Sequence, residues 1–548
     1  MHCSLSFTHQ AEEMSCPALA DVRFPVTKKQ VVDAFQHILD NPSGCEVSMK
    51  MFVQLLIHVL ELQQRSIDDV NVRENTEDVD DVKSQDGHVA QPFLRPPTLV
   101  EVPPLHQEDR QVQVVMGGFH GQPVPLAYAF LQAWKHHGCD ASVTDEMLNT
   151  DMRMTPPIHF VFLGDYVDGG HKSVTTLALV LLLVSANLAT ALTGRHEALY
   201  PVTDLVTGIF GRFDEELRLK CRKDLYMQCG SADDGDNNDE PAHCELSEAE
   251  RTIREMAAFD EIDQLVRSVF RGLPVAAVVA EKYFCICGGL TPKLQTLADF
   301  KRCGDEVIAQ SVLSDPMDDD DEYQDHELVF ATNMEKMEGF IYSFDAACHF
   351  LHDAGLLSII RCNSFVLNRD TPGTNSCGRP WHYQYSPFDS GYRLFRKMPT
   401  HGTPSTITIF SCPSYCGVNQ NLGTYVVIEP SSGKSRGVPL LNIRQFAGPK
   451  NLEGQPPGAL PNAFSWAQPL LVAWLLSALQ HITADDAEPV GEPGAALTEE
   501  EAKVIRFRRL CTLLKSKGQL DALPGAADVL RDFRSSVAAR KAAIANEL

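Results

Sequence analysis

The sequence predicts a layered α/β fold whose functional residues follow strand ends. Its 548 residues are 44% apolar, which is enough for a large core. Strand-like and helix-like segments alternate from about residue 111 to 445. Two of the strands run directly into glycine-rich polar turns, GGFHGQ (117–122) and GDYVDGG (164–170). Layered α/β folds build their sites from such loops at strand ends, so we expect the site there.

The charge of the chain restricts its partners. A formal net charge of −26 opposes nucleic-acid binding, which needs a basic surface to contact phosphates. The acidic runs are typical of solvated loops, and calcium binding is the alternative. None of them spaces its ligands as an EF-hand loop does. The runs cover 68–86, 233–240, 318–325 and 484–492.

The N-terminal residues and the cysteines favour a cytoplasmic protein. The first seventeen residues lack the basic start and apolar core of a secretory signal. The sixteen cysteines follow no regular spacing, and we expect reduced thiols rather than a disulfide framework.

Residues 1–94 predict a helical extension followed by an acidic linker. Two amphipathic stretches, 28–40 and 49–64, carry the helical pattern. Probable strands follow in TLVEVPP (98–104) and RQVQVVMGG (110–118). They begin the main domain, which we place at 95–446.

Residues 174–193 form an uncharged stretch long enough to span a bilayer. Asn187 interrupts it, and glycines bracket it closely on both sides. We prefer a buried helix that ends near Ser185 and a buried strand that begins near Leu188. A membrane span is the alternative.

The C-terminal part predicts two further helices. Residues 460–482 are uncharged from Leu460 to Gln480 and apolar on nearly every side, so a helix there requires a partner surface. An acidic linker (483–502) separates it from 503–520, a basic amphipathic helix typical of calmodulin targets or membrane surfaces. The alternative is a helix that packs on its own domain. A tail at 521–548 completes the chain.

Six turns carry a family resemblance. In order they are GGFHGQ, GDYVDGG, GRHE (194–197), CICGGLTP (285–292), IIRCN (359–363) and FSCPSYCG (410–417). They resemble the GDxHGQ, GDYVDRG, GNHE, HGGLSP, RAH and FSAPNYC turns of the phosphoprotein phosphatases. LLSIIRCN, LNIRQF and LPNAFSW look like the calcineurin A catalytic subunit. The resemblance implies a metallophosphoesterase fold, a β-sandwich flanked by helices, with C-terminal regulatory helices.

The resemblance also implies a site with two metal ions, iron and zinc or manganese, that activate a water. His120 matches a metal ligand and Asp165 the bridging carboxylate. His196 matches the general acid, and Asp168 the carboxylate that orients it.

Most of the remaining machinery is substituted. The other four ligand positions carry Gly118, Arg195, Cys287 and Asn363. The two phosphate-binding arginines are replaced by Gly169 and, within TNMEKMEGF, by Lys336. We therefore expect no metal, or one bound weakly. A Cys287 thiolate that favours zinc is the alternative.

Arg195 has two interpretations. Its guanidinium would lie where the second metal is held, and two like charges about 4 Å apart repel by roughly 4 kcal/mol at an effective dielectric of 20. It either supplies the phosphate-binding charge lost at Gly169 or pairs with Asp165 or Asp168.

Partners follow from the resemblance. Asn442, Ile443 and Arg444 match the strand that takes up peptides by strand addition, although an ordinary edge strand is the alternative. Trp466 matches a second peptide pocket. A calcineurin-B-like EF-hand subunit is expected on Phe464, Trp466, Leu470, Trp474, Leu475 and Leu479. Calmodulin is expected on Arg506, Phe507, Arg508, Arg509, Leu510 and Leu514.

Three functions remain open at this point. The first is a calcineurin-A-like pseudophosphatase that docks phosphoproteins or docking-motif peptides and EF-hand partners. The second is an active serine/threonine phosphatase with an altered dinuclear site, and the third is a small-molecule phosphoesterase. An insert within 364–390 either covers the pocket or decorates the surface.

Overall fold

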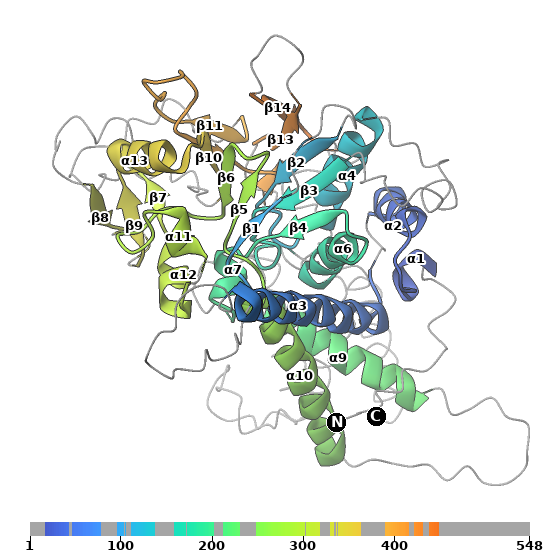
Figure 1. Ribbon diagram of the computed structural model, residues 1–548. Helices are drawn as coiled ribbons and strands as arrows, with labels where there is room; N and C mark the ends of the chain where they lie inside the picture. The colour runs from blue at the N-terminus through green and yellow to red at the C-terminus, as the bar shows by residue number, and fades with distance from the viewer. Residues whose placement is uncertain are drawn as a thin grey trace, which may run out of the picture. The chain divides into compact units, whose positions relative to one another are not determined.

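Two β-sheets pack face to face at the centre of the fold, as Figure 1 shows for the computed structural model of this chain. The structure describes residues 17–42, 46–77, 96–102, 105, 111–137, 158–170, 172–201, 212–230, 248–301, 303–317, 329–333, 336, 338–362, 390–415, 421–430 and 438–448. The predicted helices at 460–482 and 503–520, the tail and the 364–390 insert lie outside these residues.

The larger sheet has the strand order β1-β5-β6-β10-β12-β11. Parallel pairing joins β1 to β5, β6 to β10 and β10 to β12, and the other two pairs are antiparallel. The strands are β1 (Leu99–Glu101), β5 (Ala276–Val279), β6 (Tyr283–Ile286), β10 (Ser358–Arg361), β11 (Tyr392–Leu394) and β12 (Thr406–Ile409).

The second sheet has the order β14-β13-β2-β3-β4. Its strands β2, β3 and β4 run parallel, whereas β13 and β14 add antiparallel. The strands are β2 (Val112–Met116), β3 (Ile158–Phe162), β4 (Ala189–Ala191), β13 (Gly423–Glu429) and β14 (Leu440–Phe446). A small third sheet contains β7 (Asp315–Pro316), β8 (Phe330–Thr332) and β9 (Phe340–Tyr342).

One apolar cluster joins the two large sheets. Val115 and Val161 from the second sheet are buried together with Ile360 and Ile407 from the first. Strands buried on both faces read as continuous apolar runs, as YFCI in β6 does. The shared cluster confirms the expected β-sandwich.

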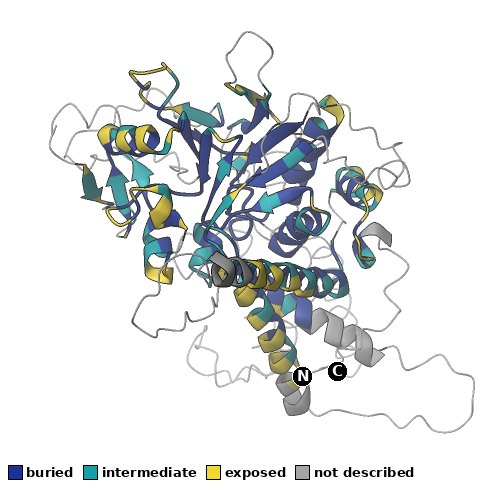
Figure 2. Ribbon diagram, viewed as in Figure 1, coloured by how far each residue is buried: buried dark blue, intermediate teal, exposed yellow. Residues whose placement is uncertain are grey.

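Helices cover the outer faces, and buried residues concentrate between them and the sheets (Figure 2). The second sheet shares its outer core with seven of the described helices, and the first sheet shares its outer core with the four that contain residues 195–198, 297–300, 305–312 and 344–354. They are α1 (Pro17–Ala20), α2 (Lys28–Asp40), α3 (Met49–Glu77), α4 (Pro123–His136), α6 (Ser173–Ser185), α7 (Arg195–Ala198), α9 (Phe213–Gly230), α10 (Glu248–Arg271), α11 (Leu297–Phe300), α12 (Asp305–Val312) and α13 (Phe344–Ala354).

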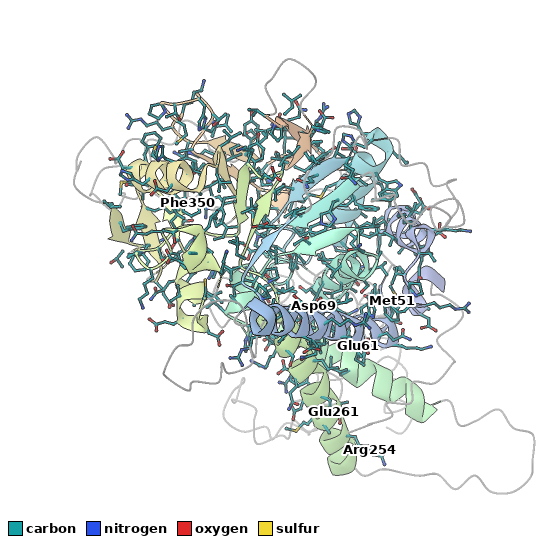
Figure 3. The ribbon with its side chains drawn as sticks, viewed as in Figure 1. Met51, Glu61, Asp69, Arg254, Glu261 and Phe350 are labelled. Carbon is teal, nitrogen blue, oxygen red and sulfur yellow. The ribbon has the colours of Figure 1, made fainter. Side chains whose placement is uncertain are left out.

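The N-terminal helices pack on this same core. Met51 of α3 is buried, whereas Glu61 and Asp69 of the same helix are exposed, as are Arg254 and Glu261 of α10 (Figure 3). The apolar stripe of α3 contacts α6, which accounts for its amphipathic pattern.

The uncharged stretch at 174–193 divides as expected. It forms α6, which ends at Ser185, and the strand β4, which begins at Ala189. Asn187 lies between them at φ 55°, in the left-handed region that asparagine tolerates. In the described part of the chain, no helix combines the length and the apolar character that a bilayer crossing requires.

Candidate active site at the strand ends

The turns that carry the family motifs meet where strands of both sheets end. The turns after β2 and β3 are joined by backbone hydrogen bonds from Gly118 N–H to Gly164 O (3.1 Å) and from His120 N–H to Asp165 O (2.9 Å). The GRHE residues begin α7 directly beyond β4. Cys287 follows β6 and Cys362 follows β10. The prediction that these strand-end turns converge is therefore confirmed.

Three polar residues of these turns adopt left-handed backbone conformations. The φ angles are 45° at His120, 57° at Asp165 and 63° at Asp168. Such angles are uncommon outside glycine, and they persist only where surrounding contacts enforce them. The turns therefore present defined side-chain directions.

Glu197 supplies much of that enforcement. Its buried carboxylate accepts hydrogen bonds from the backbone N–H groups of Gly194 (2.9 Å), Asp165 (2.9 Å) and Tyr166 (2.8 Å). Burial raises the pKa of Glu197 to about 7, and the nearby charge of Asp165 adds to that effect. Glu197 was not among the predicted site residues. Its position directly after His196 in GRHE is the sequence signal that could have identified it.

His196 and Asp168 form a buried pair. The imidazole Nδ1 lies 2.8 Å from Asp168 Oδ2, and Asp168 Oδ1 accepts the backbone N–H of Phe213 (2.8 Å). Burial opposes a charged imidazole, but the hydrogen bond and the charge of Asp168 outweigh it and raise the pKa of His196 to about 8. The pair therefore holds a proton near neutral pH, as a general acid requires.

His120 lies beside this pair but is held neutral. Burial lowers the pKa of His120 to about 4, although the charge of Asp165 partly opposes the change. Its ring meets that of His196 edge to face, with centroids 5.2 Å apart, and stacks on Phe410 at 5.5 Å. Within the described residues, Nδ1 of His120 has no hydrogen-bond partner. A neutral imidazole is the form that binds metals.

The two substituting glycines occupy backbone that resists a side chain. Gly118 has φ +74°, and a Cβ there would lie 3.0 Å from Cδ2 of Phe410. Gly169 has φ +80°, and its Cβ would lie 2.8 Å from the hydroxyl of Tyr415. Aromatic side chains thus fill the space next to a lost metal ligand and a lost phosphate arginine.

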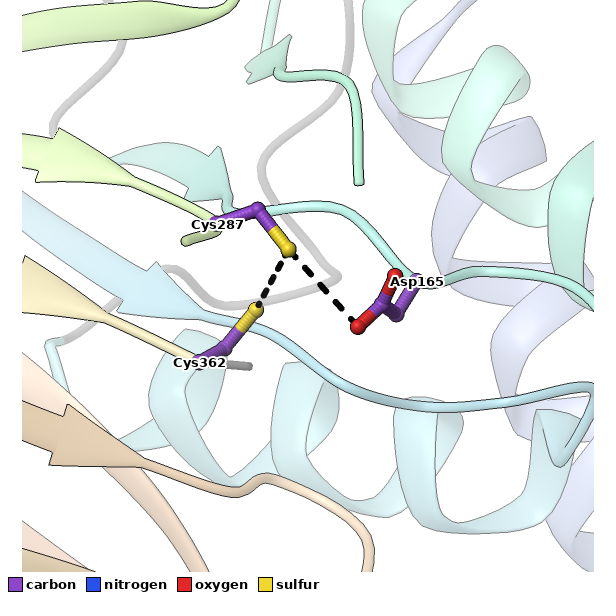
Figure 4. A group of neighbouring side chains, drawn as sticks. All are labelled: Asp165, Cys287 and Cys362. Carbon is purple, nitrogen blue, oxygen red and sulfur yellow. Dashed lines mark hydrogen bonds between the residues drawn. The ribbon is translucent and has the colours of Figure 1, made fainter. Parts of the chain in front are cut away.

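Asp165 faces two thiols, as Figure 4 shows. The Sγ of Cys287 lies 3.7 Å from Oδ2 of Asp165 and 3.8 Å from the Sγ of Cys362. All three residues are buried. Burial raises the pKa of both thiols, most strongly that of Cys287. Cys362 was missed by the sequence analysis, which took Asn363 as the relevant position in IIRCN.

Arg195 brings its charge into this region. Burial is the largest influence on the pKa of Asp165 and raises it. The charges of His196 and His120, and to a smaller extent that of the Arg195 guanidinium, oppose burial, and the pKa of Asp165 is lowered overall. Burial is also the largest influence on the pKa of His120 and lowers it, and the charge of Arg195 lowers this pKa further. Asp165 therefore remains ionised in a site that already contains fixed positive charge.

Lys336 lies in a neighbouring buried cluster of charges. Its Nζ is 2.6 Å from Asp315 Oδ2, while Asp315 Oδ1 is 2.7 Å from Nη2 of Arg361. Burial lowers the pKa of Lys336, although the charge of Asp315 opposes the shift. Arg361 also donates to Gly288 O (2.6 Å), which ties β10 to the turn after β6. Phosphate binding by Lys336 and Arg195 remains a prediction.

Among the docking residues, Asn442, Ile443 and Arg444 lie on β14, which pairs only with β13 among the described strands. Asn442 donates to Glu429 (2.8 Å) across that pair. Asn363, Trp466 and the expected EF-hand-subunit and calmodulin contacts lie outside the described residues.

The described residues do not fit the family's pair of metal ions. Of the three substituted ligand positions that the structure describes, Gly118 offers no side chain, Arg195 offers a cation and Cys287 offers a protonated thiol. Two divalent ions need several anionic ligands in common. Here the nearby aspartates are Asp165 and Asp168, and Asp168 already hydrogen-bonds His196.

Comparisons with known proteins agree with the motifs. No family model matches the chain. It is 27% identical over 368 residues to the serine/threonine-protein phosphatase 2B catalytic subunit A1 of Saccharomyces cerevisiae, covering 63% of this chain and 52% of that protein. Subunit A2 of the same yeast is 25% identical over 434 residues, covering 72% of this chain and 54% of its own. The chain thus spans about half the length of these relatives.

A solved structure, described as a protein serine/threonine phosphatase of Saccharomyces cerevisiae with similarity to human phosphatase PP5, matches at 18% identity with a TM-score of 0.44. The match covers 76% of this chain and 96% of that one. The ordered motif turns and the yeast catalytic subunits point to the same family. The chain is similar to the phosphoprotein phosphatases, on their calcineurin-like side.

Proposed function

We propose that this chain is a calcineurin-A-like pseudophosphatase, which binds phosphoproteins or docking peptides and EF-hand partners without turning over phosphoesters. The observation that carries the proposal is the donor set around Asp165. A single ionised carboxylate, two protonated thiols and the charge of Arg195 replace the anionic cage that holds two metal ions. Without those ions no water is activated for attack on phosphorus.

The retained acid does not compensate for this loss. The His196–Asp168 pair is suited to protonate a leaving alkoxide, but general acid catalysis contributes only about 10²–10⁴-fold. Uncatalysed hydrolysis of a phosphate monoester needs up to about 10²¹-fold acceleration. Protonated His196 and Arg195 would instead favour a bound phosphate, which gives the site a binding role.

Gly118 and Gly169 support a lasting loss of one metal ligand and one phosphate-binding arginine. At Gly118 and Gly169, side chains in place of glycine would adopt positive φ angles and make close contacts with Phe410 and Tyr415. The local backbone and packing are thus compatible with the absence of those side chains rather than strained by it.

Peptide docking is supported by the position of β14. A strand at the edge of a sheet presents unpaired N–H and C=O groups to an added strand. Ile443 packs toward the core between the sheets, whereas Asn442 and Arg444 alternate with it on the other face. The regulatory partners rest on the resemblance of 460–482 and 503–520 to calcineurin A.

A metal and activity measurement tests the proposal. The purified full-length chain should carry fewer than two metal ions, and with added Mn²⁺ it should hydrolyse a phosphopeptide at background rate. His196→Gln serves as the matched control. Residual turnover by this site should fall by about 100-fold or more in that variant, whereas contaminating activity should not change. Two bound ions together with rapid, His196-dependent turnover would refute the proposal.

The partner claim has its own test. Co-expression with a calcineurin-B-like EF-hand protein should give a soluble complex, and Trp466→Asp should abolish it because a buried charge disrupts an apolar interface. An unchanged complex would show that the contact lies elsewhere.

An active phosphatase with an altered centre is the second candidate. The intact His196–Asp168 pair favours it, since a proton held near neutral pH is what protonation of a leaving alkoxide requires. The same activity measurement separates the two functions.

A further inference from the structure

The thiol pair beside Asp165 has the composition of a metal site of a different kind from the family's. We propose that Asp165, Cys287 and Cys362 form a site for one thiophilic divalent cation, with zinc as the expected ion. The inference rests on the proposed function in one respect: a working dinuclear centre would claim the same Asp165 carboxylate.

The strand pairing places the two thiols side by side. β6 and β10 run parallel, with Cys285 opposite Ile360, so that two residues later Cys287 stands opposite Cys362. The backbone N–H of Cys362 donates to Cys287 O (3.2 Å), which extends the pairing to this position. Asp165 reaches the same point from the turn after β3, in the other sheet. Rigid strand ends from both sheets thus supply the three ligands.

The distances match those of a tetrahedral zinc site. Zinc bonds of about 2.3 Å to sulfur and about 2.1 Å to oxygen place tetrahedral ligands about 3.8 Å apart for two sulfurs and about 3.6 Å apart for sulfur and oxygen. The observed separations are 3.8 Å for the two sulfurs and 3.7 Å between Cys287 Sγ and Asp165 Oδ2. The remaining pair, Asp165 and Cys362, lies within 4.8 Å, so all three ligand atoms can face one ion.

The charge balance also suits one zinc ion. As the ion binds, each thiol releases its proton to solvent, and one doubly charged cation replaces two protons. The net charge of the buried site is unchanged, so Arg195 does not oppose this exchange as it opposes two hard ions held by carboxylates.

The donor type selects the metal. Thiolate ligands favour zinc over magnesium, calcium or manganese, which prefer oxygen. Three protein ligands leave one tetrahedral position open, and a single ion there lacks the second ion with which the family's centre activates a water. The site is thus a mononuclear, sulfur-rich replacement at the position where the family carries two ions.

The experiment uses the full-length chain purified without added metal or chelator. Elemental analysis should find one zinc per chain. After zinc removal, Co²⁺ should produce an intense near-ultraviolet thiolate-to-cobalt band that Zn²⁺ abolishes. Cys287→Ala and Cys362→Ala should each weaken Zn²⁺ binding by at least about 100-fold, because each loses a direct ligand. Cys285→Ala is the matched control, a buried cysteine two residues earlier on the same strand, and should leave the affinity within about threefold.

A measurement on the unaltered chain covers the case in which a variant fails to fold. Zn²⁺ should slow alkylation of Cys287 and Cys362, read by peptide mass spectrometry, and should leave that of Cys285 unchanged. Two free thiols without zinc affinity, or a Cys287–Cys362 disulfide, would overturn the metal site and leave the pseudophosphatase proposal intact. Rapid phosphopeptide turnover with Mn²⁺ in the same preparation would refute the pseudophosphatase proposal instead.

Discussion

Replacing Asp168 by asparagine tests the electrostatics of the His196 pair. The substitution keeps the side-chain shape, and asparagine tolerates the left-handed backbone found at φ 63°. It also preserves an oxygen that can accept the Phe213 N–H, which Asp168 Oδ1 accepts at 2.8 Å. What it removes is the negative charge 2.8 Å from His196 Nδ1.

The magnitude follows from the pKa of His196. The difference between a pKa of about 8 and the ordinary histidine pKa of 6.5 corresponds to about 2 kcal/mol, at about 1.4 kcal/mol per pH unit. Because the pKa is raised in the folded state, this stabilisation is complete below pH 6.5 and is lost as the pH rises through 8. Asp168→Asn should therefore lower the free energy of unfolding by about 2 kcal/mol more at pH 6 than at pH 9.

Urea unfolding of both chains at the two pH values measures this difference. Asp353→Asn is the control, because Asp353 contacts His352 (3.1 Å) in a solvent-exposed pair whose charges are screened. That variant should show the same small change at both pH values. If the cost of Asp168→Asn were also equal at pH 6 and pH 9, the charge of Asp168 would not be what keeps His196 protonated.

Three further substitutions test other parts of the site. Gly118→Ser should lower the free energy of unfolding, measured in urea, by about 1–2 kcal/mol, because the backbone is left-handed and the new side chain contacts Phe410. The control Gly304→Ser, at φ −75° and with open space, should leave it unchanged, and equal losses would contradict the strain assigned to Gly118. Asp315→Asn should lower the free energy of unfolding by about 3–5 kcal/mol, because it leaves the buried Arg361 without its carboxylate partner. A loss below about 1 kcal/mol would show that the charges around Arg361 rearrange to compensate. Glu197→Leu should lower the free energy of unfolding by about 3 kcal/mol or more, because it leaves three buried backbone N–H groups unpaired. Protease cleavage within 164–168 should then appear, and an unaltered cleavage pattern would count against the role of Glu197 in holding that turn.

The motif turns allowed much of the site to be predicted. His120, Asp165, Asp168 and His196 are recognisable because each stands at a fixed offset from glycines that close the turn after a strand. Parallel strands bring their carboxyl ends to one edge, so residues far apart in the chain meet there. The helix and strand within 174–193 were likewise predictable, because Asn187 marks the boundary between them.

Other features required the packing. Nothing in IIRCN distinguishes Cys362 from Asn363 as the residue that faces Asp165, because the direction of a side chain past a strand end depends on the register with β6. The rings of Phe410 and Tyr415 fill the space beside Gly118 and Gly169. From the sequence, these two glycines are recognisable only as the loss of a metal ligand and of a phosphate-binding arginine. Lys336 was predicted to bind phosphate, and only the folded chain shows its ion pair with Asp315.

The sequence by itself determined the family resemblance, the layered α/β fold and the substitution of most metal-ligand positions, because motif order and residue chemistry are local properties of the chain. The tertiary structure decided which of the remaining groups interact. Asp165, Cys287 and Cys362 lie 122 and 75 residues apart along the chain and come within bonding reach of one cation. Distances between side chains on different strands depend on sheet pairing and on the packing of the two sheets, and no local pattern encodes them.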